Sequence, residues 1–87
     1  MKIKNGFMLR KVGAQNVVVA VGEASRSFNG IIRLNDSGRY LWEKLQQETT
    51  EQQLLSDMLG DYNIDEATAR ADIERFVQSL KGAGLLE

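Results

Sequence analysis

The sequence contains no cysteine, no histidine and no proline among its 87 residues. Without cysteine there is no disulfide, and no thiolate can act as a nucleophile or a metal ligand. Without histidine, the commonest general base and the commonest transition-metal ligand are both missing. Serine-triad catalysis as it is usually built is therefore excluded, and we expect neither a catalytic residue nor a bound cofactor.

Long apolar runs and an excess of either charge are missing as well. No stretch of about 18 apolar residues could span a bilayer, and no apolar segment follows Lys2 and Lys4 as a secretion signal requires. We therefore expect a cytoplasmic protein without a membrane partner. The net charge is −1 and the two signs interleave, which argues against a nucleic-acid partner, because phosphate binding needs clustered cations.

What the sequence does contain is enough for one core. Hydrophobic residues make up 43%, and no linker or repeat divides the chain, so we expect a single domain over residues 1–87. The first third predicts three strands at 7–12, 17–21 and about 27–34, with turns at 13–16 and 22–25, as in an antiparallel meander. The second strand is β-branched and apolar on both sides, which favours burial of both faces.

The third strand joins directly to an amphipathic helix. Phe28, Ile32 and Leu34 share one face of this strand with Gly30, whose bare backbone would let another backbone approach closely. Asn35 and Asp36 then supply N-cap chemistry, and the apolar period changes from two to 3.6. We expect this first helix to begin at Asp36.

Two further helices follow. Thr50 opens a capping box, and Asp65 caps the last helix. Their apolar stripes comprise Leu54, Leu55, Met58, Leu59 and Tyr62, and then Ala69, Ile73, Phe76, Val77, Leu80 and Ala83. Gly82 and Gly84 are candidate terminators, after which Leu85 and Leu86 would return to the core. Trp42 borders the stripe of the first helix, and we expect it to be partly exposed. Three strands before three helices indicate an α+β domain.

Two kinds of site are weighed and disfavoured. Asp57, Asp61, Asp65 and Glu66 lack the spacing of a calcium loop, so we expect no metal. The order of strands and helices also fits an alternative hypothesis, a winged-helix nucleic-acid-binding protein. In such a protein the last helix would be the recognition helix. From residue 65 to 81 that helix carries three positive and four negative charges, which makes a poor probe of the major groove.

A set of short motifs runs through most of the chain. They are Leu34-Asn35 followed by Ser37, the helix RYLWEKL, Thr50-Glu51, Ala71-Asp72-Ile73, Phe76-Val77 before Leu80, and the ending Gly84-Leu85-Leu86. With these motifs and their spacing, the sequence resembles the PqqD family, the small peptide-binding proteins of pyrroloquinoline quinone biosynthesis and related peptide-maturation systems. The resemblance implies a three-stranded sheet with a three-helix bundle of winged-helix type.

The resemblance also implies a function. Such domains are recognition elements that bind the leader segment of a ribosomally made precursor peptide. They present it to a modifying enzyme, commonly a radical S-adenosylmethionine maturase. The leader typically adds as a strand to the third strand and lies against the third helix, and the domain itself is not an enzyme.

The implied site has two parts. The strand residues are Asn29, Gly30, Ile31, Ile32, Arg33 and Leu34, and the helix residues are Asp72, Arg75, Phe76 and Ser79. Strand addition obtains affinity from main-chain hydrogen bonds and specificity from pockets for alternate side chains. Arg33 and Arg75 would favour acidic leader residues, whereas Ile31 and Phe76 would receive an apolar one.

The sequence departs from family members dedicated to the quinone cofactor. Those have an alanine-rich first helix and an Asp-Gly turn, whereas here the helix carries Arg39, Tyr40 and Trp42, and residues 46–49 replace the turn. A different precursor peptide is the favoured hypothesis. A homodimer remains a further possibility, since an exposed strand edge can pair with a second copy.

Overall fold

The computed structural model describes residues 1–27 and 30–87. The elements, in chain order, are β1 (Phe7–Val12), β2 (Gln15–Ala20), α1 (Ala24–Ser27), β3 (Ile31–Leu34), α2 (Asp36–Lys44), α3 (Glu51–Asp61) and α4 (Glu66–Gly82). The three strands form one antiparallel sheet in the order β1-β2-β3. The predicted α+β class and the meander are therefore confirmed.

The sheet register places alternate residues on opposite faces. Leu9, Val18 and Ile32 align across the three strands, and all three pack into the hydrophobic core or against it. Because side chains alternate along a strand, their neighbours in sequence lie on the other face. The inner face of the sheet is the one that carries this row.

The connections between strands differ from the sequence prediction. The first turn is shorter than expected because β2 begins at Gln15, and Gly13 makes the bend with φ 62°. The expected turn at 22–25 contains the start of the short helix α1, where the Ser25 hydroxyl donates to the Gly22 carbonyl at 2.7 Å. The third strand begins at Ile31 rather than near residue 27, and Phe28 and Asn29 lie outside the described residues.

Each of the three longer helices starts at an N-cap residue that the sequence predicted. Asn35, Thr50 and Asp65 accept hydrogen bonds from the backbone N–H three residues later, which satisfies one of the donors left free at a helix start. Hydrogen bonds from the Thr68 side chain and backbone hold the pKa of the Asp65 carboxyl below its usual range. These helix starts are confirmed.

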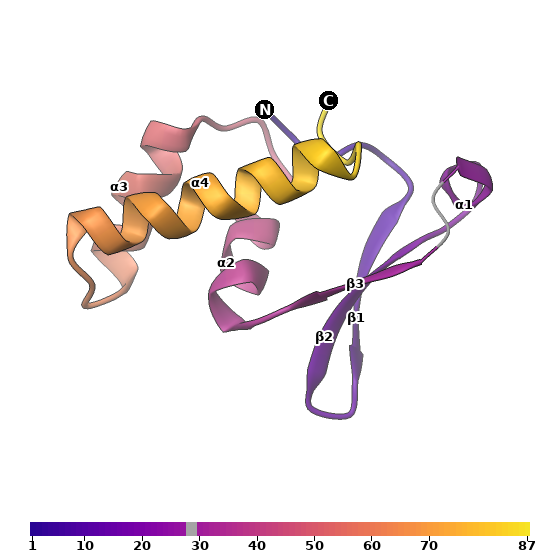
Figure 1. The fold of residues 1–87 in the computed structure, drawn as a ribbon, viewed down its shortest axis with the longest axis horizontal. Coiled ribbons are helices and arrows are strands. Elements are labelled where there is room, and N and C mark those ends of the chain that lie inside the picture. Colours follow the sequence, from indigo (N-terminus) through magenta and orange to yellow (C-terminus); the bar gives the residue numbers. More distant parts are fainter. Residues whose placement is uncertain (28–29) are drawn as a thin grey trace.

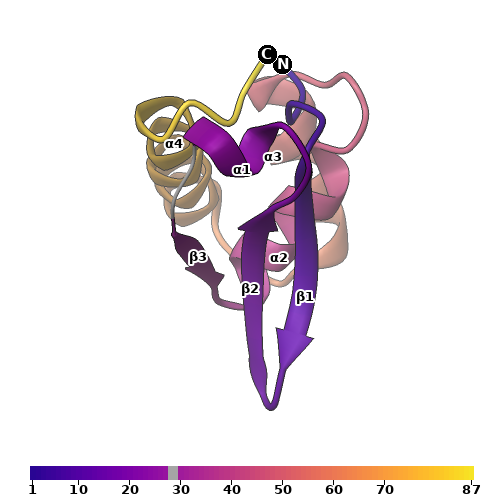
Figure 2. The same ribbon diagram turned by 90° about the vertical axis from the view of Figure 1, so that its right-hand side faces the viewer.

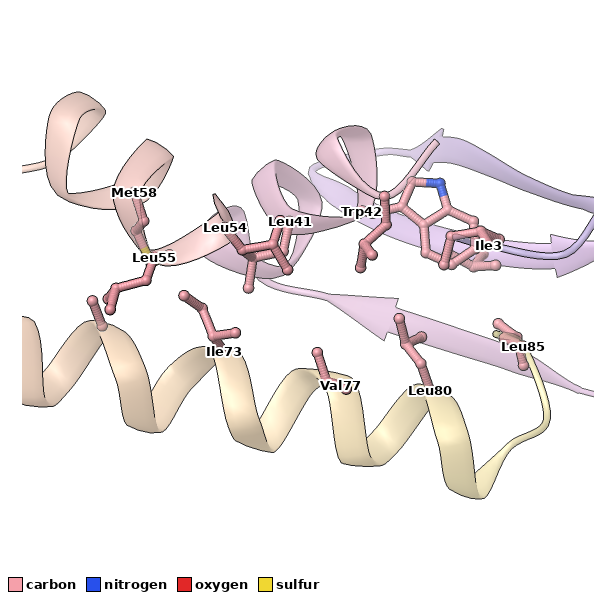
Figure 3. Close-up of a cluster of buried hydrophobic side chains, with 13 residues drawn as sticks. Ile3, Leu41, Trp42, Leu54, Leu55, Met58, Ile73, Val77, Leu80 and Leu85 are labelled. Atoms are coloured by element: carbon pink, nitrogen blue, oxygen red, sulfur yellow. The ribbon is translucent and has the colours of Figure 1, made fainter. Parts of the chain in front are cut away.

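The core lies between α4 and the other helices. Ile73, Val77 and Leu80 of α4 point toward Leu41 and Leu54, from α2 and α3 (Figure 3). All of these side chains are at most 2% exposed. Burying a leucine or isoleucine side chain contributes roughly 1.5–3 kcal/mol, so this seam supplies much of the stability.

Two aromatic residues depart from expectation. Trp42 is 2% exposed rather than partly exposed, because the N-terminal segment brings Ile3 over its ring (Figure 3). Tyr62 does not belong to the apolar stripe: it follows the end of α3, is 41% exposed, and stacks edge-on against Tyr40 with ring centroids 5.0 Å apart.

The C-terminal segment returns to the core as predicted. Gly84 adopts φ 76°, whereas Gly82 remains the last residue of α4 and is not a terminator. Leu85 is fully buried, and Leu86 is half-buried and forms a β-bridge with Ile3. The two ends of the described chain therefore lie side by side (Figures 1 and 2).

The helices α2, α3 and α4 all lie on one side of the sheet (Figure 2). The hairpin of β1 and β2 extends beyond them as a wing (Figure 1). Among the residues the structure describes, no helix is long and apolar enough to cross a membrane.

Candidate functional site

The strand β3 forms an edge of the sheet. Its one partner among the described strands is β2. In an antiparallel edge strand, alternate residues direct N–H and C=O away from the neighbouring strand. The side of Ile31–Leu34 away from β2 therefore offers main-chain donors and acceptors to an added strand.

A hollow lies where α4 passes the start of α2. It encloses about 140 Å³ and is lined by Asn35, Ser37, Gly38, Leu41, Asp72, Arg75, Phe76 and Ser79. The structure thus brings all four helix residues predicted from the sequence to one place. They share one face of α4, because positions three and four apart are neighbours on a helix.

The start of α2 shapes the floor of this hollow. The Asn35 side chain accepts from the Gly38 N–H at 2.8 Å and from the Ser37 hydroxyl at 3.1 Å. A Cβ on Gly38 would stand 3.4 Å from Phe76 Cε1 and 3.5 Å from Leu34 Cβ. The absent side chain therefore lets the Phe76 ring lie over the helix backbone, close to the end of β3.

The wall on α4 is polar and nearly balanced in charge. Arg75 Nη2 lies 3.3 Å from Asp72 Oδ1, and the Ser79 hydroxyl donates to the Arg75 carbonyl at 3.0 Å. The Arg75 side chain is 74% exposed, so this ion pair contributes little to stability. The guanidinium can exchange Asp72 for a carboxylate of a ligand without a large desolvation cost.

The strand residues are divided between two faces. Ile32 and Leu34 lie on the inner face and pack against the core together with Phe76. Ile31, which is 57% exposed, and Arg33 lie on the opposite, outer face. The structure therefore separates the two pairs that the sequence interpretation grouped, Arg33 with Arg75 and Ile31 with Phe76.

Of the remaining predicted residues, the structure describes Gly30, just before β3. Gly30 precedes the strand, is exposed, and a Cβ on it would meet no atom within 4 Å. Asn29 lies outside the described residues. Arg33 and Leu34 also line a shallow hollow of about 390 Å³ with the end of the wing, including Gln15.

Sequence reasoning missed the contribution of α2. The hollow is lined by Asn35, Ser37, Gly38 and Leu41, although the sequence interpretation drew the site only from the third strand and the last helix. The available signal was Gly38, since a glycine inside a helix costs about 1 kcal/mol relative to alanine and usually has a packing reason.

The site carries hydrogen-bonding and apolar groups but no nucleophile paired with a base. Within residues 1–27 and 30–87, no three acidic side chains gather closely enough to hold a metal ion. The arrangement offers a strand edge, an aromatic ring and a polar helix wall. Such a site is suited to binding an extended peptide.

Fold and site together define a winged-helix-type domain with an open strand edge beside a helix groove. The family model described as "Coenzyme PQQ synthesis protein D (PqqD)" matches residues 15–86. The chain therefore belongs to the PqqD family, as the motifs in its sequence indicated. No sequence among the curated proteins matches it.

A solved structure shares the whole fold. It is described as "TbiB1 in Complex with the TbiA(beta) Leader Peptide" and is 20% identical in sequence, with a TM-score of 0.76. The similarity covers 100% of the present chain and 95% of that one. At this identity the likeness establishes the fold.

Proposed function

We propose that this chain is a non-catalytic adaptor that binds the leader segment of a ribosomally made precursor peptide and presents it to a modifying enzyme. The observation that carries the proposal is the free edge of β3 beside the hollow lined by Phe76 of α4, in a member of the PqqD family. The leader-bound state of the TbiB1 structure supports the same assignment.

The leader adds as a strand along Ile31–Leu34, and its main chain completes hydrogen bonds on the open side of β3. Its inward side chains meet the ring of Phe76 and the polar wall of Asp72, Arg75 and Ser79. Its outward side chains lie beside Ile31 and Arg33. Gly30 extends the same edge toward the start of the strand, and Asn29 stays a predicted contact of the leader.

The modifying enzyme is a radical S-adenosylmethionine maturase. The cofactor chemistry belongs to that enzyme, which the adaptor supplies with an ordered peptide. Since the leader pairs mainly through its backbone, one adaptor fold can serve different precursor peptides. The aromatic residues and arginine of α2 favour a precursor other than that of the quinone cofactor.

Single N-methylation of the leader backbone provides a direct test. A series of synthetic leader peptides, each methylated at one amide, is titrated against the purified chain by calorimetry. In strand addition only every second leader N–H faces β3, so affinity should fall at alternate positions. Equal affinity at every position would refute pairing with β3.

A second measurement locates the site. Backbone amide shifts in the NMR spectrum should concentrate in β3, the start of α2 and the Asp72 to Ser79 face of α4. Chemical shift changes confined to α3 and the wing would show that the leader binds at another site.

A further inference from the structure

The outer face of the sheet collects exposed apolar side chains. Met8, Val12 and Ile31 are 47%, 63% and 57% exposed, and all three lie on this face by the strand register. Met8 and Ile31 flank Val19 in a single row across the three strands. Val12 lies on the same face beyond the next row, opposite Gln15. Exposed apolar side chains gathered on one face of a small protein mark an interaction surface.

Two arginines lie in the adjacent row. Arg10 and Arg33 are the register partners of Val17 on its two sides. Val17 is only 5% exposed although it lies on the open face, as expected if the long arginine stems cover it.

These two arginines differ from the others in the chain. Four of the six arginines each form an ion pair with a carboxylate three or four residues away, namely Arg26, Arg39, Arg70 and Arg75. Arg10 and Arg33 have no ion pair within the part of the chain that the structure describes. The outer face therefore combines apolar contact area with two uncompensated positive charges.

A leader strand beside β3 would not cover this face. It would lie in the plane of the sheet, roughly 14 Å from β1, since neighbouring strands are about 4.8 Å apart. Met8, Arg10 and Val12 of β1 would remain exposed in the complex. The helices α2, α3 and α4 lie behind the sheet and do not cover this face (Figure 2).

We propose that the outer sheet face is the docking surface for the modifying enzyme, through an apolar patch of that enzyme that carries carboxylates. Complementary charges at Arg10 and Arg33 would steer the encounter and fix its orientation. The docked enzyme would lie against the outward side chains of the leader strand. This inference rests on the proposed function, but it concerns the outer face of the sheet, which shares only Ile31 and Arg33 with the leader site.

The test uses two double variants of matched composition. Met8→Gln/Arg10→Gln removes one exposed apolar side chain and one arginine from the outer face. Tyr62→Gln/Arg70→Gln removes a similarly exposed aromatic side chain just after α3 and one arginine from α4. The probe is the purified radical S-adenosylmethionine maturase of the proposed function, titrated against each variant in its leader-bound form.

The first variant should bind the enzyme about tenfold more weakly, the loss of one interface anchor, and the second within about twofold of the wild type. Leader affinity should be unchanged in both. The wild-type interaction should weaken with salt, as expected for charge pairing at an exposed surface. Circular dichroism confirms that each variant is folded.

Several outcomes would overturn the proposal. The enzyme could bind both variants equally or bind the first more tightly, or the outer-face residues could instead control self-association in sedimentation experiments. A wild-type chain that binds the leader but not the enzyme would also overturn it while leaving leader binding intact. Failure to bind the leader would reject the proposed function itself.

Discussion

The ring of Phe76 in α4 lies against the backbone of Gly38 in α2: a Cβ on Gly38 would stand 3.4 Å from Phe76 Cε1 and 3.0 Å from the Asn35 side-chain oxygen. This contact joins the start of one helix to the middle of another at the point where β3 ends. It sets the depth of the proposed leader groove.

Replacing Gly38 by alanine tests that contact. In a helix, glycine to alanine usually stabilises by roughly 0.5–1 kcal/mol. At Gly38 the added methyl group crowds Asn35 and Phe76, so we expect no such gain in the free energy of unfolding, together with weaker leader binding. Gly60 of α3 is the control, because a Cβ there would meet no atom within 4 Å. Urea denaturation should show Gly60→Ala as the stabilised variant; an equal gain at Gly38 would contradict the close packing.

Replacing Ile31 by aspartate tests the strand edge. The change places a charge and a poor strand former beside the leader, so we expect several-fold weaker leader binding with the fold retained. The matched control is Val12→Asp, which makes a similar change at an exposed position of the other edge strand. Calorimetric titration of both variants with the leader checks this. A loss of equal size at Val12 would mean that the effect is not specific to β3.

The link between Tyr40 and Asp61 predicts a pH dependence at the alkaline end. The Tyr40 hydroxyl donates to Asp61 Oδ2 at 2.5 Å, and burial, followed by this hydrogen bond and the Asp61 charge, raises the pKa of Tyr40 far above its usual range. Because the folded pKa exceeds the unfolded value of about 10, this stabilisation is complete below that pH. It is lost as the pH rises toward the folded value.

The variant Tyr40→Phe separates the contribution of the Tyr40 hydroxyl to stability from that of the lysines, which titrate in the same pH range. Wild type should be more stable than the variant at pH 8, and the difference in free energy of unfolding should narrow above about pH 10. Denaturation curves at several pH values measure it. A constant difference would show that the pKa of Tyr40 is the same in the folded and the unfolded state.

Leu85 should be far more important for stability than the residue beside it. It is fully buried, and its carbonyl accepts from the Lys4 N–H at 2.8 Å. Leu85→Ala should lower the free energy of unfolding by about 2–5 kcal/mol. The half-buried Leu86 is the control, and its alanine variant should cost clearly less in the same urea experiment. Equal losses in the free energy of unfolding for the two variants would contradict the difference in burial between Leu85 and Leu86.

The parts of the fold that the sequence predicted correctly depend on local chemistry. Asn35, Thr50 and Asp65 each bond to a backbone N–H three residues away, so the signal and the structure lie within one helical turn. The grouping of Asp72, Arg75, Phe76 and Ser79 on one face of α4 has the same local basis, because positions three and four apart share a face. The choice of that face came from the family resemblance.

The errors and omissions concern contacts between distant segments. Burial of Trp42 depends on Ile3, which reaches it from the N-terminus (Figure 3). The part of α2 in the groove depends on how that helix passes α4. The alternation along β3 correctly predicted the inward position of Ile32. The sequence did not show on which side of the sheet the helices pack, so the separation of Ile31 from Phe76 became visible only in the three-dimensional structure.

The two-residue alternation of β3 has a consequence for how a precursor peptide can evolve. A leader paired with this strand would turn one set of its side chains toward the groove beside Phe76 and the other set toward the face that bears Ile31 and Arg33. A substitution in the set that faces the groove would change binding to the adaptor. A substitution in the other set would change contacts with the enzyme. Recognition by the adaptor and recognition by the enzyme could then diverge independently within the same few residues.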